Sequence, residues 1–364
     1  MTVSMLLLLA GFVLLLGGAE LLVKGASRLA LSLGITPLVV GLTVVAFGTS
    51  APELAVSVRA ALAGDGAAEI AVGNVVGSNI ANVLLILGVS ALIAPLAVSR
   101  QVIRLEVPVM VGCSVALVAL AFDGRVSRVE GAALFAGIVA YTVFAIVQSR
   151  RETSAERRDR PPEQAPDRRR LMLDVGLAAA GMALLVLGAR WLVDGAVDLA
   201  TRLGVSELII GLTVVAFGTS LPELATSALA AFRGERDLAV GNVVGSNVFN
   251  ILSVLGLSAL VASGGIAVTE EARLFDLPVM LAVALLCLPV FFTGFRIDRV
   301  EGALFVLFYG LYVTFLVLYS VSAPSVDLLR RVVVYGVAPV TAVTLGFAVF
   351  DQWRQERRRQ PPAG

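Results

Sequence analysis

The amino-acid sequence predicts an all-α integral membrane protein, built from two inverted repeats of five transmembrane helices and one additional C-terminal transmembrane helix. The composition, an internal repeat and the number of apolar runs in each copy lead to this prediction. Of the 364 residues, 58% are hydrophobic and 15% are charged, whereas about a quarter of the residues in a soluble domain are charged. Apolar runs that reach the ~20 residues of a spanning helix recur along the whole chain.

The internal repeat is clearest in two blocks. The decapeptide GLTVVAFGTS occurs at 41–50 and again at 211–220, and each copy continues through any residue into P-E-L-A. The block AVGNVVGSN follows at 71–79 and at 239–247. Weaker matches extend the repeat outwards, among them VPVM and LPVM at 107–110 and 277–280. Each half of the chain is therefore predicted to be one folding unit.

Each copy of the repeat contains five apolar runs. In the first copy they cover about 4–31, 36–62, 69–94, 105–122 and 128–148. In the second copy they cover about 171–201, 206–232, 238–262, 272–292 and 298–320. An odd number of spans makes the second copy start on the opposite side of the membrane, so the repeats are inverted, as in many secondary transporters. A further run, at about 331–350, has no partner in the repeat.

The basic residues predict the division and the orientation of the chain. We expect a first repeat, a basic cytoplasmic linker, a second repeat, an additional transmembrane helix and a basic cytoplasmic tail, at 1–148, 149–170, 171–320, 321–350 and 351–364. Arginines concentrate in the linker, which we expect to be a disordered connector, and in the tail. Because basic segments stay in the cytoplasm, the N-terminus should lie outside and the C-terminus inside. This describes a multi-pass protein of the inner cell membrane.

Two spans in each copy carry polar residues at their centres, and they indicate the chemistry. Glu53 and Glu223 follow the sequence G-T-S-x-P, whose proline removes a helical hydrogen bond and frees carbonyls near Thr49 and Thr219. Such carbonyls are tolerated in hydrocarbon only where they line a polar cavity. Two mid-membrane carboxylates facing each other favour a bound cation between them. The nearby groups are oxygens and amides and the chain has no histidine, which predicts Ca²⁺ or Na⁺.

Other polar and small residues have structural interpretations. Asn74 and Asn242 could cap half-helices or contact ions. The glycines of the repeated blocks could serve helix packing alone. Four further interpretations are structural: local ion pairs for Glu20 with Lys24 and for Arg190 with Asp194, membrane-interface positions for Arg59 and Arg233, and supporting roles for Glu106 and Asp276.

With G-T-S-x-P-E and G-S-N-x-x-N each present twice, the sequence resembles the sodium/calcium exchanger family of Ca²⁺:cation antiporters, in its prokaryotic form, over about residues 1–320. The resemblance implies a ten-helix antiporter, not an enzyme, in which helices 1 and 6 slide past the core to alternate access. It implies that Ca²⁺ is bound by Glu53 and Glu223 with the carbonyls of Thr49 and Thr219. The implied Na⁺ ligands add Ser50, Ser78, Ser220, Ser246 and the carbonyls of Ala46 and Ala216, while Asn82 and Asn250 complete the central subsite.

Position 250 departs from part of this family, because some relatives, including K⁺-dependent ones, carry Asp where this chain has Asn250. We therefore expect electrogenic exchange of Ca²⁺ for Na⁺ that does not need K⁺. The expected partners are Ca²⁺, Na⁺ and the lipid bilayer, with no cofactor, nucleic acid or protein partner implied. Three alternatives stay open: a Ca²⁺/H⁺ antiporter of the same superfamily, with Glu53 and Glu223 carrying protons, a passive cation channel, and a membrane scaffold that transports nothing.

Overall fold

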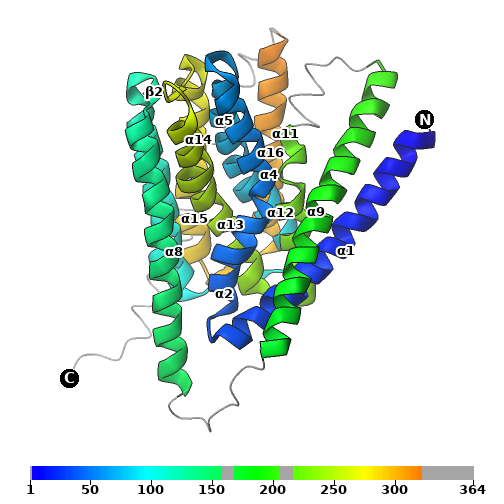
Figure 1. The fold of residues 1–364 in the computed structure, drawn as a ribbon, viewed down its shortest axis with the longest axis vertical. Helices are drawn as coiled ribbons and strands as arrows, with labels where there is room; N and C mark the ends of the chain where they lie inside the picture. Colours follow the sequence, from blue (N-terminus) through cyan, green and yellow to red (C-terminus); the bar gives the residue numbers. More distant parts are fainter. Residues whose placement is uncertain (1, 158–167, 205–215, 322–364) are drawn as a thin grey trace.

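The computed structural model describes residues 2–157, 168–204 and 216–321, and it is a bundle of long helices (Figure 1). The first half contains, in order, α1 (Thr2–Leu33), α2 (Pro37–Val40), the π-helical η1 (Gly41–Val45), α3 (Ala46–Thr49), α4 (Ala51–Ala63), α5 (Asp65–Ala81), the π-helical η2 (Asn82–Leu87), α6 (Gly88–Ile93), β1 (Leu96–Ala97), the π-helical η3 (Val102–Glu106), α7 (Val107–Leu120), the 3₁₀ turn η4 (Ala121–Asp123), β2 (Arg125–Val126) and α8 (Arg128–Arg157).

The second half repeats this order of elements. It contains α9 (Arg168–Arg202), α11 (Ala216–Gly218), α12 (Leu221–Arg233), α13 (Arg236–Phe249), the π-helical η6 (Asn250–Leu255), α14 (Gly256–Val261), β3 (Ile266–Ala267), the π-helical η7 (Ala272–Asp276), α15 (Leu277–Phe292), β4 (Arg296–Ile297) and α16 (Arg299–Ser320).

Within the described residues, eight helices are long and apolar enough to cross a membrane, and the bent pair Pro37–Thr49 and Ala51–Ala63 makes a ninth span. All nine coincide with predicted apolar runs. The predicted eleventh span, 331–350, lies outside the described residues, and so does part of the predicted span 206–232. The prediction of an all-helical membrane protein is confirmed.

The predicted linker 149–170 is shorter as a connector than we expected. α8 continues to Arg157 and α9 begins at Arg168, so the interpretation of the whole segment as disordered is wrong at both of its ends. Arginine, glutamate and alanine are good helix formers. A spanning helix can therefore continue beyond its apolar part without further packing.

Two short antiparallel strand pairs connect the halves of the chain. β1 pairs with β4, and β2 pairs with β3. In the repeat, β1 corresponds to β3 and β2 corresponds to β4, so each strand pairs with a strand of the other copy. The two pairings are equivalent to each other when the copies are exchanged, which is the arrangement that a pseudo-two-fold axis produces.

Small residues at a seven-residue spacing bring α1 and α9 together backbone to backbone. Gly11 and Gly18 of α1 face Gly188 and Gly181 of α9, and a Cβ atom added at Gly18 would lie 2.7 Å from the backbone nitrogen of Leu185. The contacts run in opposite directions along the two helices, so the pair is antiparallel. Figure 1 shows α1 and α9 side by side along one edge of the bundle. Such glycine contacts are typical of close helix packing in membranes.

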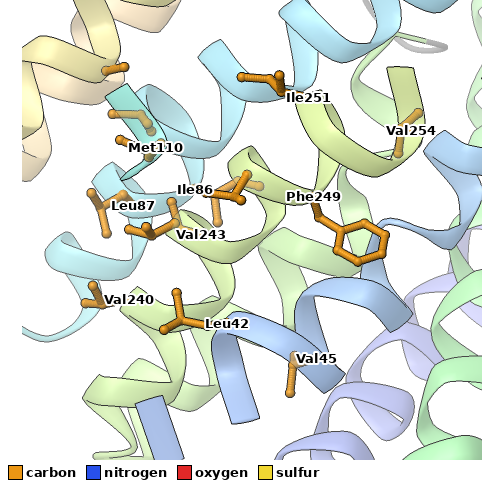
Figure 2. Packing of buried hydrophobic residues seen from close by; sticks show 14 of the residues in the cluster. Leu42, Val45, Ile86, Leu87, Met110, Val240, Val243, Phe249, Ile251 and Val254 are labelled. Atoms are coloured by element: carbon orange, nitrogen blue, oxygen red, sulfur yellow. The ribbon is translucent and has the colours of Figure 1, made fainter. Parts of the chain in front are cut away.

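The centre of the bundle is formed by the continuous spans α5–η2–α6 and α13–η6–α14, which carry the repeated asparagine-rich blocks. Figure 2 shows buried apolar side chains from these spans and from η1 and α7, among them Leu42, Ile86, Met110, Val243 and Ile251. A Cβ atom added at Gly41 would lie 2.8 Å from the carbonyl oxygen of Leu238, and one at Gly241 would lie 2.6 Å from that of Leu38. At these two glycines the interpretation as packing residues is confirmed.

Candidate ion-binding site

The chain breaks its helical course at equivalent places in the two copies, at Ser50 and at Ser220. The backbone of Ser50 has φ −81° and ψ 8°, and that of Ser220 has φ −88° and ψ 5°. The next helix starts with a proline in its first turn in both copies, and Pro52 has no N–H to give to the carbonyl of Gly48. The two helices on either side of Ser50 are bent by 47°. The predicted break within the span is confirmed.

Glu53 and Glu223 lie in the first turns of α4 and α12, directly after these breaks, and both are completely buried. Each accepts a hydrogen bond from the serine at the break of the other copy. Ser50 Oγ donates to Glu223 Oε1 at 3.0 Å, and Ser220 Oγ donates to Glu53 Oε1 at 3.3 Å. The two carboxylates therefore meet at one site between the copies, as the sequence predicted.

Each of these carboxylates has a second oxygen that is buried without a hydrogen-bond partner, Glu53 Oε2 and Glu223 Oε2. The side-chain oxygens of Asn82 and Asn250 share this property. Buried polar atoms are normally hydrogen-bonded, and an unpartnered buried charge is costly. These atoms form two equivalent pairs, with one carboxylate oxygen and one amide oxygen from each copy. Buried oxygens without a hydrogen-bond partner are suited to bind a cation.

Asn82 and Asn250 begin the π-helical segments η2 and η6. π-helical turns often occur at functional sites, because the wider turn shifts side chains and backbone groups out of the α-helical pattern. Both asparagines are buried, and their amide nitrogens donate to the asparagine of G-S-N in the other copy, Asn247 and Asn79, at 3.0 and 3.1 Å. The side-chain oxygens of Asn82 and Asn250 take no part in these hydrogen bonds, so they remain available to a ligand.

The predicted hydroxyl ligands are in the same region, but their contacts differ between the copies. Ser78 Oγ lies 3.3 Å from Ser220 Oγ, within hydrogen-bond distance, whereas Ser246 Oγ is buried without a partner. The hydroxyl of Thr49 donates to Asn242 Oδ1 at 3.2 Å, and that of Thr219 donates to Asn74 Oδ1 at 3.4 Å. These hydroxyl contacts fix the two threonine side chains next to the breaks.

The carbonyl groups predicted as ligands lie on the helical turns before the breaks. Thr49 is the last residue of α3, and Thr219 follows α11. The carbonyl of Ala46 accepts the backbone N–H of Ser50 at 3.0 Å. Ala216 is the first residue of α11. The roles of all these carbonyls as ligands stay predictions.

Asn74 and Asn242 join neighbouring helices near the site, a role that the sequence did not suggest. Asn74 Nδ2 donates to the carbonyl of Glu53 at 3.2 Å and to Ser57 Oγ at 2.9 Å, and Asn242 Nδ2 donates to Ser227 Oγ at 2.9 Å. Each asparagine thus connects its own helix to the helix that carries the glutamate. The repeat spacing gave no sign of this, because serines four residues after each glutamate looked like ordinary helix residues.

The chemistry of the site follows from the atoms it offers. The two carboxylates each contact a serine hydroxyl of the other copy, and no group of three or more His, Cys, Asp or Glu side chains suited to a metal occurs in the part of the chain that the structure describes. Oxygen ligands of this kind suit hard cations such as Ca²⁺ and Na⁺, and they do not suit soft metals that prefer thiolates or imidazoles.

The charged residues outside the site mostly behave as predicted. Glu20 and Lys24 form an ion pair at 2.7 Å, and Arg190 reaches Asp194 at 3.9 Å. The guanidinium of Arg233 binds both carboxylate oxygens of Glu20, at 2.7 and 3.1 Å, a pairing that the sequence did not predict, and its position at the membrane interface stays a prediction. That contact joins α12 to α1, and the reason it was missed is that the partner lies far away in the sequence.

The two remaining acidic residues have structural contacts. Glu106 accepts hydrogen bonds from the hydroxyl of Tyr141 at 2.7 Å and from Gln101 at 3.1 Å. Asp276 accepts one from Tyr312 at 3.1 Å. Both carboxylates connect the start of one span to a neighbouring span, which confirms their interpretation as structural residues.

Comparison with known proteins agrees with this arrangement. The pattern of the family described as "Sodium/calcium exchanger protein" matches residues 3–147 and 173–318, which are the two repeats. The chain is 40% identical over 250 residues to the inner membrane protein YrbG of Escherichia coli K12, covering 66% of this chain and 75% of that protein. It is 36% identical over 306 residues to the sodium/calcium exchanger MaX1 of Methanosarcina acetivorans, covering 75% of this chain and 85% of that protein.

The fold is similar to that of a solved exchanger. The sodium-calcium exchanger NCX_Mj, soaked with 10 mM Na⁺ and no Ca²⁺, superimposes with a TM-score of 0.75 at 29% sequence identity. The match covers 86% of this chain and 98% of NCX_Mj. Because the family pattern covers most of the chain and both copies of the repeat, this multi-pass membrane protein belongs to the sodium/calcium exchanger family.

Proposed function

We propose that the protein is a secondary antiporter that exchanges Ca²⁺ for Na⁺ by alternating access, without K⁺ and with net movement of charge. It would lie in the inner cell membrane with its N-terminus outside. The observation that carries the proposal is the group of four buried oxygens without partners, from Glu53, Glu223, Asn82 and Asn250. The chain's similarity to MaX1 and NCX_Mj, which are both sodium/calcium exchangers, supports it.

Ca²⁺ fits the atoms that the site offers. Its two charges balance those of Glu53 and Glu223, and the two asparagine oxygens add neutral ligands. With the carbonyls of Thr49 and Thr219 the oxygens reach the lower end of the six to eight that Ca²⁺ takes. The break after each threonine supports this use of the carbonyls, because backbone without its helical partner needs a polar surrounding in the membrane.

Na⁺ would compete for the same oxygens. Ser50 and Ser220 already contact the carboxylates. Ser78 and Ser246 lie on the neighbouring helices α5 and α13, and their hydroxyl oxygens can coordinate a cation. Several Na⁺ ions spread over these oxygens would displace one Ca²⁺, and more than two of them would move net charge. The neutral Asn250 supports independence from K⁺, since no third carboxylate is added to the central subsite.

Transport in proteoliposomes tests the proposal. Vesicles loaded with Na⁺ and diluted into Na⁺-free, K⁺-free medium should take up ⁴⁵Ca²⁺, and an inside-positive potential should speed the uptake. The potential can be set with a chloride gradient and a chloride carrier, which keeps K⁺ out of every arm. Vesicles with the Glu53→Gln variant are the matched negative control.

Four outcomes would contradict the proposal. Uptake driven by a pH gradient without Na⁺ would assign the protein to Ca²⁺/H⁺ exchange. Uptake of Ca²⁺ without any counter-ion would indicate a channel, and an absolute need for K⁺ would contradict the role given to Asn250. Uptake that ignores the membrane potential would show that equal charges are exchanged.

A further inference from the structure

Four asparagines form a symmetrical network behind the proposed ion site. Asn82 and Asn250 are the proposed ligands, and Asn79 and Asn247 are the last residues of the two G-S-N sequences. Asn82 Nδ2 donates to Asn247 Oδ1 at 3.0 Å, and Asn250 Nδ2 donates to Asn79 Oδ1 at 3.1 Å. Each ligand asparagine is thus held by an asparagine of the opposite copy, and all four are buried.

The orientation of Asn79 is set by groups that only accept hydrogen bonds. Its amide nitrogen faces the backbone carbonyl of Asn247 at 3.2 Å and the sulfur of Met280 at 3.8 Å. Neither a carbonyl nor a thioether can donate, so the nitrogen of Asn79 must point to them. Its oxygen is therefore on the other side, where it can accept only from the nitrogen of Asn250.

The same logic holds in the other copy with a different anchor. Asn247 Nδ2 donates to the sulfur of Met110 at 3.3 Å. Its oxygen then faces Asn82 and accepts from the nitrogen of that residue. Met110 and Met280 end the repeated sequence x-P-V-M, for which the function described so far has no use. Both lie in the buried core, on α7 and α15.

We propose that Asn79, oriented by the backbone carbonyl of Asn247, and Asn247, oriented by the sulfur of Met110, are positioning residues that hold the amides of Asn250 and Asn82 with their oxygens toward the cation. An asparagine amide has one accepting and two donating sites, and the wrong orientation would present N–H groups to a positive ion. This inference rests on the proposed function, because it concerns ligands of the same site.

The two copies give the inference an internal control. Asn79 has a backbone carbonyl as well as a distant sulfur, so Met280→Leu leaves its orientation fixed. The nitrogen of Asn247 has the Met110 sulfur at 3.3 Å, so Met110→Leu removes the acceptor that orients Asn247. Methionine to leucine conserves volume and normally costs little stability. We expect Met110→Leu to weaken Ca²⁺ binding several-fold and Met280→Leu to leave it unchanged.

A double-mutant cycle tests the ligand itself. Ca²⁺ binding is measured by calorimetry on the purified full-length protein in nanodiscs. Asn79→Leu removes the hydrogen bond that orients Asn250. We expect the Ca²⁺ affinity to fall about tenfold, which is the usual effect of losing one buried hydrogen bond. In a protein that already carries Asn250→Ala, Asn79→Leu should add less than a twofold loss, because no amide is left to orient. A merely structural Asn79 would weaken both backgrounds alike.

Equal losses in the two backgrounds, or wild-type affinity in Met110→Leu, would overturn the inference. If Asn79→Leu does not yield folded protein, the two methionine variants alone decide it. The proposed function fails separately, when Glu53→Gln binds Ca²⁺ as the wild type does. The Glu53→Gln variant is therefore measured first, on its own. If it has lost Ca²⁺ binding, the site is established, and the results for the Asn79 and Met110 variants then decide the positioning role alone.

Discussion

Replacing either carboxylate with its amide, Glu53→Gln or Glu223→Gln, is the most direct perturbation of the proposed site. The side chain keeps its size and one oxygen but loses a negative charge. At about 4 Å and an effective dielectric constant of about 20, one charge pair is worth about 4 kcal/mol, hence about 8 kcal/mol for a divalent ion. If ion hydration and movement of neighbouring oxygens offset half of this, about 4 kcal/mol remains, a loss of roughly 10³-fold in Ca²⁺ affinity.

The same reasoning predicts a smaller loss for Na⁺. A monovalent ion interacts half as strongly with the missing charge, which leaves about 2 kcal/mol, or roughly a 30-fold loss. Either variant should therefore also lose its preference for Ca²⁺ over Na⁺. The two variants should be alike, because each glutamate is fully buried, accepts one serine hydroxyl and keeps one oxygen without a partner.

Titration of purified protein with Ca²⁺, alone and in competition with Na⁺, measures both affinities. Glu106→Gln is the matched control, since Glu106 is also buried but is bonded to Tyr141 and Gln101 away from the site. It should bind both ions as the wild type does. A Ca²⁺ affinity within tenfold of the wild type in either glutamate variant would refute the shared site, and equal losses for the two ions would refute the electrostatic argument.

The remaining predictions concern the scaffold and its orientation. Gly18→Ala should lower thermal stability and transport, because its Cβ would meet the backbone of α9 at 2.7 Å, whereas Gly17→Ala should change neither, since nothing lies within 4 Å of that position. Arg233→Gln removes the ion pair between α12 and α1 and should alter the transport rate with a stability loss of at most about 1 kcal/mol. Its control, Arg190→Gln, loses only an exposed pair within α9 and should transport normally. Single cysteines in the linker 149–170 and in the C-terminal tail, placed in a protein free of other cysteines, should both react with impermeant reagents only from the cytoplasm; labelling from opposite sides would refute the orientation.

Much of the site could be predicted because the repeat shows each important feature twice, once in each copy. One proline-broken helix with a glutamate could be a packing feature, but Glu53 and Glu223 occur at the same place in two copies. Inverted copies bring equivalent residues together around the pseudo-two-fold axis. The meeting of these two carboxylates with the serines of the opposite copy follows from that geometry.

The contacts that could not be predicted join residues that the repeat does not relate. Arg233 has no equivalent with a charge in the first copy, because the corresponding position is Ala63. Its bond to Glu20 therefore depends on how α1 packs against α12. The orientation of the asparagine amides is also invisible in the sequence, since it depends on whether each neighbour donates or accepts.

The two copies have nearly the same sequence around the site, yet their contacts differ. Ser78 Oγ lies within hydrogen-bond distance of Ser220 Oγ, at 3.3 Å, while the equivalent Ser246 hydroxyl has no partner. The difference cannot come from local sequence at these residues, because Ser50 and Ser220, like Ser78 and Ser246, occupy equivalent places in the repeat. A shift of one copy relative to the other would produce such a difference. If each copy took up the arrangement that the other has now, the molecule would have a second conformation with equivalent hydrogen bonds. In that conformation the two copies, and so the two sides of the membrane, would have exchanged roles. Two arrangements of similar energy are what the proposed alternating access requires, and in that proposal a small difference in affinity for Ca²⁺ or Na⁺ is enough to shift the balance between them.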